Sequence, residues 1–329
     1  METKLNYKRT FLIGLAFLSI CSFWQMYDNI IPLILQNTYH LGETMTGAVM
    51  ALDNVLAIFL LPVCGMLSDK VHTKLGRRMP FIVVGTILAV IFMMMLPMID
   101  NAEKARWATG GSFSNQVFFL GVLFLTLVSM GLYRSPAVAL MPDVTPNHLR
   151  SRANAVINLM GAVGGVYALI MIKVLVGKGE TPDYLPLFAS IAAVMAIAVG
   201  ILVITIRENK LREEVEKAEA ANADTIEEKA MAEGVEAAGE IEAVGDTGEA
   251  KAFEEKQQTA KTESTKDMPK DVKRSMYFML ASIFLWFTAY NAVTTAFSRY
   301  TKVVWKMEGG SFANCLMVAT VAAILSYIP

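Results

Sequence analysis

The chain has 329 residues, of which 54% are hydrophobic, and its formal net charge at pH 7 is −1. That charge gives no long-range attraction for nucleic acid, and the three cysteines lie singly in apolar runs, which excludes the disulfide framework of a small secreted domain. Several apolar runs reach about 20 residues, the length of a helix that crosses a bilayer. The composition therefore predicts an all-α polytopic membrane protein.

Eight apolar segments are long enough to be spanning helices. We expect them at 10–36, 45–67, 80–98, 116–140, 153–175, 185–206, 276–297 and 310–329. Runs of this length exclude the short alternating strands of a membrane β-barrel. The first helix is expected to be retained, because it is longer than the apolar part of a signal peptide and no small-residue cleavage site ends it.

The basic residues of the short connecting segments predict the orientation. With the N-terminus inside, nine lie in inner segments, namely Lys4, Lys8, Arg9, Lys70, Lys74, Arg77, Arg78, Arg150 and Arg152. Only four lie in the outer loops of the first six helices, namely Lys104, Arg106, Lys173 and Lys178. Because inner loops carry the excess of Lys and Arg, we expect a cytoplasmic N-terminus and an inner loop between helices two and three.

The first two predicted helices carry polar residues within their apolar runs. In helix one these form a stripe at helical spacing, made of Cys21, Gln25, Asp28, Asn29 and Pro32. Such a stripe faces a cavity or another helix rather than lipid. Helix two adds Asp53 and Asn54, so two carboxylates are expected to face one space. A dehydrated carboxylate can take up a proton near neutral pH, but each acid could instead be a structural hydrogen-bond partner or a wet residue at headgroup level.

The segment GMLSDKVHTKLGRRMP (65–80) concentrates charge between two apolar runs. Asp69 ends helix two and can pair with Arg77 or Arg78, or with the N-terminus of an opposing helix. Contacts of this kind, formed in one conformation and broken in another, would make a gate. Gly65 is expected to permit close helix approach. The basic residues taken alone could equally be topological anchors of an inner loop.

A second charged segment, RSPAVALMPDVTPNHLRSRANAVINLMGAVGG (134–165), joins helices four and five. We expect Asp143, Arg150 and Arg152 to lie with the first charged loop. Arg134 could pair with a cavity acid, bind a substrate hydroxyl, or extend to the membrane surface as a helix-end arginine.

Residues 207–275 interrupt the apolar pattern with a tract that is rich in Glu, Ala and Lys. Most of the 30 acidic residues of the chain lie there. We expect a largely disordered cytoplasmic linker, or alternatively a regulatory segment. The predicted domains are a six-helix bundle at 1–206, this linker at 207–275, and helices seven and eight of an incomplete second bundle at 276–329. Tyr290 and Asn291 of helix seven are candidate substrate contacts, with helix packing as the alternative.

The two charged segments resemble the loop 2–3 signature and the helix 4–5 segment of the major facilitator superfamily. The spacing S-D-x6-G-R-R-x-P-F-I is similar to that of sucrose/proton symporters (solute carrier family 45 type) and of glycoside–pentoside–hexuronide symporters. The resemblance implies a twelve-helix fold of which this chain has the first eight helices. It also implies a gating role for the inner loop, made of Gly65, Asp69, Gly76, Arg77, Arg78, Asp143, Arg150 and Arg152.

The resemblance leads us to expect a plasma-membrane carrier that moves a sucrose- or maltose-like sugar with protons. Asp28 and Asp53 are the candidate proton carriers. The candidate sugar contacts are Gln25, Asn29, Asn54, Arg134, Tyr290 and Asn291. Melibiose-type carriers bind cations with helix-two acids, at places that here hold Ala57 and Leu61, so proton coupling is favoured over sodium.

Two other functions stay open, a sodium-coupled or facilitative carrier of another solute and a non-transporting membrane sensor. No cofactor, metal or catalytic motif is expected. The sequence leaves the oligomeric state, the sugar and the direction of transport undetermined.

Overall fold

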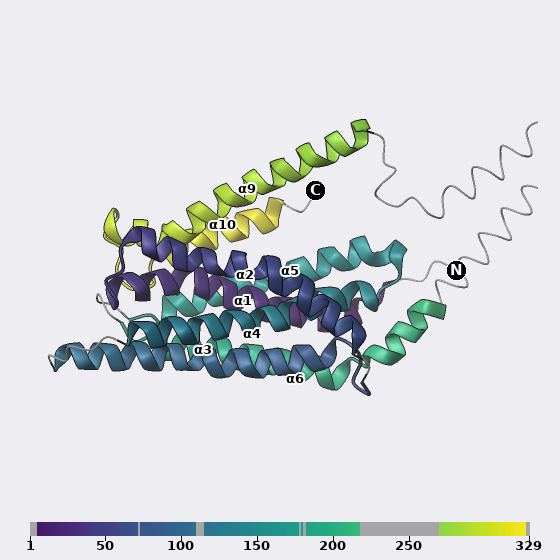
Figure 1. Ribbon diagram of the computed structural model, residues 1–329, viewed down its shortest axis with the longest axis horizontal. Coiled ribbons are helices and arrows are strands. Elements are labelled where there is room, and N and C mark those ends of the chain that lie inside the picture. The colour runs from purple at the N-terminus through teal and green to yellow at the C-terminus, as the bar shows by residue number, and fades with distance from the viewer. Residues whose placement is uncertain are drawn as a thin grey trace, which may run out of the picture. The chain divides into compact units, whose positions relative to one another are not determined.

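The structure is a computed structural model that describes residues 5–71, 73–109, 115–177, 179, 182–217 and 270–326. Six long helices make up most of the first part of the chain (Figure 1). They are α1 (Tyr7–Asn37), α2 (Glu43–Lys70), α3 (Met79–Ala108), α4 (Gln116–Asp143), α5 (Arg150–Leu175) and α6 (Leu185–Thr205). A short 3-10 turn, η1 (Asn147–Leu149), precedes α5, and residues 208–217 are helical as well. Most of the acidic tract, at 218–269, lies outside the described residues.

Two further helices follow the acidic tract, α9 (Lys270–Val303) and α10 (Ala313–Ser326). By their contacts, residues up to Lys217 and from Thr294 onward form one compact unit, and Ala218–Val293 forms a second. The first unit therefore contains α1–α6, the end of α9 and α10. The second unit contributes the first part of α9 to the described residues.

Seven of the eight expected spans have the length and apolarity of membrane helices in the described part of the chain. The eighth corresponds to α10, whose 14 helical residues are fewer than a span needs. Several helices are longer than their apolar runs. The clearest case is α3, which continues to Ala108 because its polar last turns are internally paired, with Lys104 bonded to Asp100 at 2.5 Å.

Small residues bring α1 close to α5. A Cβ placed on Gly164 would lie 2.1 Å from the backbone oxygen of Leu18, so only glycine fits at this crossing. Ser22 uses the proximity and donates a hydrogen bond to the Gly164 carbonyl at 2.9 Å. On another side of α1, the buried hydroxyl of Tyr133 in α4 donates to the Ala16 carbonyl at 3.0 Å.

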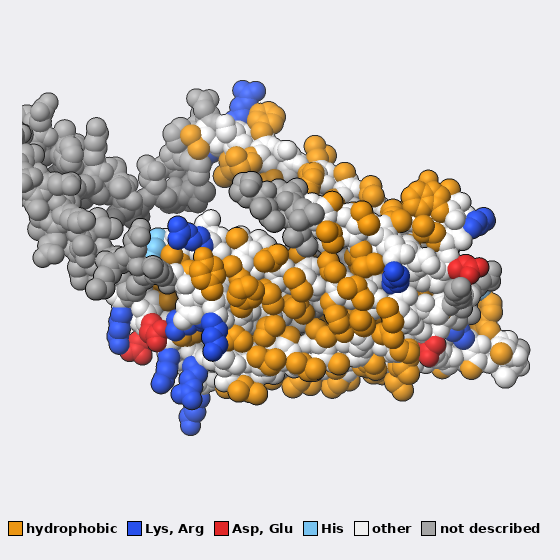
Figure 2. All heavy atoms as spheres, turned by 180° about the vertical axis from the view of Figure 1, so that it is seen from behind, with side chains coloured by type: hydrophobic (Ala, Val, Ile, Leu, Met, Phe, Trp, Pro, Cys, Tyr) orange, Lys and Arg blue, Asp and Glu red, His pale blue; other side chains and the backbone are white. Residues whose placement is uncertain are grey.

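The remaining contacts arrange the six helices around α1 and α3. Helix α4 packs against α2 and α3, and α6 packs against α1 and α3. The α3–α4 approach is tight at Gly85, where a Cβ would lie 2.7 Å from the Tyr133 nitrogen. On the face seen in Figure 2, apolar side chains cover the middle of the helices, and most Lys, Arg and acidic side chains lie toward their ends. This is the surface of a membrane-spanning bundle.

Candidate functional site

A cluster of charged side chains joins the ends of α2, α3 and α4. Arg78 is at its centre, with a side chain that is only 7% exposed. Its Nη2 atom lies 2.5 Å from Asp69 Oδ1, and its Nε atom lies 2.9 Å from Asp143 Oδ2. Its third nitrogen, Nη1, donates to the Ser68 hydroxyl and to the Gly65 carbonyl, at 2.5 and 3.3 Å. One guanidinium thus links three helix ends.

Arg77 adds a second, weaker contact to the same group. Its Nη2 atom is 3.7 Å from Asp143 Oδ2, and its buried Nε atom has no hydrogen-bond partner among the residues described. The structure therefore brings Asp69, Arg77, Arg78 and Asp143 together, as the sequence led us to expect, and Arg78 rather than Arg77 makes the short bonds.

A fifth charged residue, Glu208, belongs to this cluster and was not among the candidates. It is 1% exposed, and its carboxylate accepts hydrogen bonds from the backbone N–H groups of Arg77, Arg78 and Met79 at 2.8 to 3.0 Å. These groups form the N-terminus of α3, where unpaired donors and the helix dipole favour a negative charge. We refer to Asp69, Arg77, Arg78, Asp143 and Glu208 as the Arg78 cluster.

The sequence did contain a signal for Glu208. It is the first acid after the apolar run of α6, whereas the next acids, Glu213 and Glu214, come a full turn later. We had assigned it to the acidic linker because its composition matches the tract that follows. Composition does not show that the backbone N–H groups of a distant helix end lie beside it.

Glu208 also explains why a glycine precedes the two arginines. Gly76 has a φ of 127°, which side-chain-bearing residues rarely adopt, and it closes a tight turn with Thr73. A Cβ at this position would lie 2.1 Å from Glu208 Oε2. The turn conformation and the buried carboxylate therefore both require glycine.

The helix packing around Gly65 does not require a glycine, although we expected Gly65 to permit a close helix approach. A Cβ there would lie 3.4 Å from Ser135 Oγ, which is an ordinary contact. The tighter α2–α4 contact is at Gly131, where a Cβ would be 3.0 Å from Leu60 Cδ1. What Gly65 supplies to the cluster is its carbonyl oxygen, which accepts from Arg78.

The two arginines at the start of α5 differ in their surroundings. Arg150 donates to the backbone oxygens of Pro142 and Thr145, at 2.9 and 3.2 Å, and so ties the α4–α5 connection to the end of α4. Arg152 is exposed and contributes none of the ion pairs found in the described ranges. Arg150 thus supports the position of Asp143 through the backbone, while Arg152 points to solvent.

The helical residues 208–217 lie across this end of the bundle. Asn209 donates to the carbonyls of Thr73 and Lys74 in the α2–α3 turn, at 3.0 and 3.3 Å. Glu214 forms an ion pair with Arg9 of α1, at 3.2 Å. The first residues after α6 therefore contact both the α2–α3 turn and the start of α1.

A small cavity lies within the bundle between α1, α2 and α4. Its volume is about 40 Å³, and Asp53, Asn54, Trp24 and Arg134 are among the residues that line it. The Arg134 guanidinium lies over the Trp24 ring, 5.6 Å from its centroid. Asn54 donates to Asp53 Oδ1 at 3.0 Å. Three of the candidate residues, Asp53, Asn54 and Arg134, thus meet at one small cavity whose lining is otherwise mostly apolar, and Asn54 is exposed.

The polar stripe of α1 lies in several environments. Asp28 is half-buried and close enough to Asp53 for the two carboxylates to interact electrostatically. Gln25 faces α5, with its Oε1 atom 3.7 Å from the Cβ position of Gly165. Asn29 is buried and donates to the Gln25 carbonyl at 2.8 Å, while its Oδ1 atom has no hydrogen-bond partner among the described residues. Gln25 and Asn29 do not line the cavity.

The two remaining candidates, Tyr290 and Asn291, lie on α9 in the second unit. The Tyr290 ring stacks on Trp286, with centroids 5.8 Å apart. The cavity residues belong to the first unit, so Tyr290 and Asn291 are not among them. Across the described ranges, no group of three or more His, Cys, Asp or Glu side chains could hold a metal ion.

Comparison with known proteins identifies relatives of this chain. The sequence model of the family described as Major Facilitator Superfamily matches residues 8–329. Among curated proteins, the chain is 26% identical over 137 residues to the sucrose transport protein SUT3 of Oryza sativa subsp. japonica. The aligned segment covers 39% of this chain and 27% of that protein. It is 36% identical over 117 residues to the sucrose transport protein SUC4 of Arabidopsis thaliana, or 33% of this chain and 22% of that protein.

The two sucrose transport proteins match this chain over only a part of their own length. The aligned segments cover about a quarter of the length of each relative, so they show shared ancestry for a part of those proteins. The family match covers nearly the whole chain. The all-helical architecture and the seven apolar helices of membrane-spanning length agree with it.

Proposed function

Since the chain belongs to the major facilitator superfamily and is an integral membrane protein, we propose that it is a secondary carrier that moves a sugar with protons by alternating access. The substrate class is a glucoside of the sucrose or maltose type. The membrane is the plasma membrane, with the N-terminus and the linker at 207–275 in the cytoplasm. We propose 1–206 as the first bundle, with residues 208–217 packed against its end, and 276–329 as the start of the second.

The observation that carries this proposal is the small cavity between α1, α2 and α4, which has a few polar side chains in a mostly apolar lining. Asp53, Asn54 and Arg134 line it beside the Trp24 ring. Sugars bind through hydrogen bonds to carboxylate, amide and guanidinium groups, with an aromatic ring packed on their C–H face. A set of this composition inside a membrane bundle is expensive to maintain, which favours a functional role over a packing role.

The cavity is too small for a disaccharide. A volume of about 40 Å³ holds only one or two water molecules. In a carrier that works by alternating access, the binding site lies at the interface of two bundles and opens and closes around the substrate. We therefore assign the cavity as the first-bundle wall of the site, with Tyr290 and Asn291 as candidate contacts from α9.

Proton coupling is assigned to the carboxylates of Asp28 and Asp53. The two acids lie near one another in an apolar bundle, and acidic residues within spanning helices are rare and mark proton pathways. A proton bound to one of these carboxylates would reduce the negative charge of the site while the sugar is bound. The Arg134 guanidinium interacts electrostatically with Asp53 and can take over as its partner after the proton leaves.

The Arg78 cluster is proposed as the cytoplasmic gate. It joins the ends of three helices through one guanidinium, so a rearrangement of any one helix end changes the partners of the others. Such an all-or-none contact set is what a two-state gate requires.

The test is uptake of radiolabelled sucrose and maltose into proteoliposomes that contain the purified chain, with and without an inward proton gradient. We expect uptake that the gradient stimulates, and we expect Asp28→Asn and Asp53→Asn each to abolish the stimulation. Unchanged pH dependence in both variants would refute the coupling assignment. Glu213→Gln, at an exposed acid far from the cavity, is the matched control.

The same assay separates the alternatives. Uptake driven by sodium would identify a sodium-coupled carrier, and uptake without any gradient would identify a facilitative carrier. Binding of sugar without uptake would identify a sensor that has kept the fold. Both results would replace the symport proposal.

A further inference from the structure

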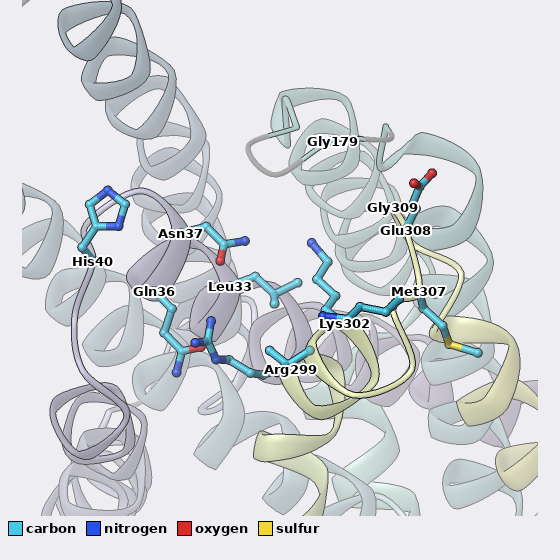
Figure 3. A pocket seen from close by; sticks show the side chains of 12 residues that line it. Leu33, Gln36, Asn37, His40, Gly179, Arg299, Lys302, Met307, Glu308 and Gly309 are labelled. Carbon is cyan, nitrogen blue, oxygen red and sulfur yellow. The ribbon is translucent and has the colours of Figure 1, made fainter.

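A large pocket lies at the end of the bundle opposite the Arg78 cluster, between the end of α1 and the connection from α9 to α10. Its volume is about 820 Å³. All its lining residues belong to the first unit of the chain. In Figure 3 the side chains of Arg299 and Lys302 reach from the last turns of α9 toward Gln36 and Asn37 at the end of α1.

The charge of the lining is mainly positive. Three cations, Arg299, Lys302 and Lys306, line the pocket with one acid, Glu308. Within the described ranges, neither lysine forms an ion pair, and the only one of Arg299 is a long contact of 3.9 Å with Glu43. Lys302 is half-buried as well. Arg299 and Lys302 are thus partly removed from water without a close acidic partner among the described residues, which is unfavourable, so the pocket is suited to receive an anion.

The pocket also contains buried hydrogen-bonding atoms that no described group satisfies. These are the Nε atom of Arg299, a donor, and the Oε1 atom of Gln36, an acceptor. A cation in the last turn of a helix often does no more than offset its dipole, which would explain Lys302. Lys306 lies beyond the end of α9, in a left-handed conformation with φ of 54°, and the dipole does not explain its place at the pocket.

Aromatic and apolar side chains border the pocket at the end of α9 and in the residues that follow it. Tyr300 and Trp305 are about half exposed, and their rings meet edge to face with centroids 5.7 Å apart. Val303 lines the pocket, and its neighbour Val304 is exposed. Tyr and Trp beside Lys and Arg at the end of a spanning helix mark the headgroup level of a membrane.

We propose that this pocket binds the phosphate group of an anionic phospholipid headgroup. Lys302, Lys306 and Arg299 contact the phosphate oxygens, and the acyl chains follow the apolar surface beyond Tyr300 and Trp305. A free phosphate ion would use the same three cations, but it would gain nothing from the aromatic and apolar border, which favours the lipid. The inference depends on the chain spanning a membrane and holds whether or not the chain transports sugar.

The test measures equilibrium binding of fluorescent phosphatidylglycerol to the purified chain in detergent micelles, with unlabelled phosphatidylglycerol, phosphatidylcholine and inorganic phosphate as competitors. We expect phosphatidylglycerol to compete, and phosphatidylcholine and inorganic phosphate at equal concentration to leave binding unchanged. Lys302→Gln and Lys306→Gln should each weaken binding about fivefold, because one basic residue near an anionic headgroup contributes about 1 kcal/mol.

Two control variants make the result specific. Lys173→Gln removes an exposed lysine from the last turn of α5, which does not line the pocket, and should leave binding unchanged. Glu308→Gln removes the acid of the pocket and should tighten binding severalfold, a gain that a misfolded variant cannot produce. Equal binding by all four variants would overturn the site, and competition by inorganic phosphate as strong as by phosphatidylglycerol would overturn the lipid assignment.

Discussion

Glu208 accepts hydrogen bonds from the backbone nitrogen of Arg78 through both carboxylate oxygens, each at 3.0 Å, although the two residues are 130 positions apart in the sequence. The contact fixes the first turn of α3 and with it the direction in which the Arg78 side chain leaves the backbone. Arg78 then reaches Asp69 and Asp143. Glu208, three residues after the end of α6, therefore positions the centre of the proposed gate.

Replacing Glu208 should destabilise the fold. We expect Glu208→Ala to lower the free energy of unfolding by about 3 kcal/mol, because it leaves buried N–H groups of the α3 N-terminus without an acceptor. Glu208→Gln keeps one acceptor oxygen and should cost about 2 kcal/mol. Thermal unfolding of the purified variants in detergent measures both. Glu213→Gln removes an exposed acid of the same segment and serves as the control; equal stability of all three would contradict the capping role.

The Arg78–Asp143 pair should show strong energetic coupling. Asp143 is 20% exposed and Arg78 7%, so removing one partner leaves a charge that water reaches poorly. A double-mutant cycle with Arg78→Gln and Asp143→Asn should give a coupling energy of about 1–2 kcal/mol in unfolding experiments. The same cycle on the exposed pair Arg212 and Glu216 should give less than about 0.5 kcal/mol. Equal coupling in the two pairs would show that burial adds nothing.

Two glycines with similar positive φ values allow the cost of backbone strain to be separated from the cost of a steric contact. Gly76 and Gly179 have φ values of 127° and 123°, but a Cβ on Gly179 would meet nothing within 4 Å. We expect Gly179→Ala to cost about 1 kcal/mol, from backbone strain alone. Gly76→Ala should cost at least about 2 kcal/mol more, since its Cβ would displace the Glu208 carboxylate. Unfolding curves of the two variants compare them directly, and equal losses would exclude a contribution from Glu208.

A second pair of glycines tests the α1–α5 crossing. Gly164→Ala places a methyl group against the Leu18 backbone, which cannot rotate away, and should destabilise the bundle by about 3 kcal/mol. Gly121→Ala, on an open face of α4, should be neutral or stabilising by up to about 1 kcal/mol, because alanine favours a helix over glycine. Thermal unfolding in detergent again gives the comparison. A stable Gly164→Ala variant would mean that the two helices can separate freely.

Asp183 predicts a pH dependence of stability outside the membrane-spanning segments. Partial burial opposes ionisation, but hydrogen bonds from Asn101 and the Leu185 backbone, with the nearby Lys104 charge, lower the pKa of its carboxyl. The unfolded chain then binds the proton more readily, so the contribution is complete above the unfolded pKa of about 3.9 and is lost as pH falls through the lower folded value. The stability difference between the wild type and Asp183→Asn should therefore shrink below about pH 4. A difference independent of pH would contradict the ionised contact.

Much of the candidate site could be predicted from the sequence because charge inside an apolar chain is conspicuous. Asp69, Arg78 and Asp143 were each expected at an inner helix end, and the structure brings all three together at one end of the bundle. Glu208 was missed because it is one acid among many. The helical spacing places Gln25 and Asn29 on one stripe of α1. Spacing does not show which neighbour each residue meets: Gln25 faces α5, and Asn29 donates a hydrogen bond to the α1 backbone.

By itself, the sequence determined that the chain crosses a membrane, where most of its spans lie, and which loops are charged. These properties are local, because a bilayer requires a continuous apolar run for each span and every backbone bond of a helix lies within a few residues. The tertiary structure alone decided which faces meet. A helical period assigns residues to a face, but only packing of the whole bundle brings Glu208 to the first turn of α3, Arg134 to Asp53 and Lys302 to the end of α1.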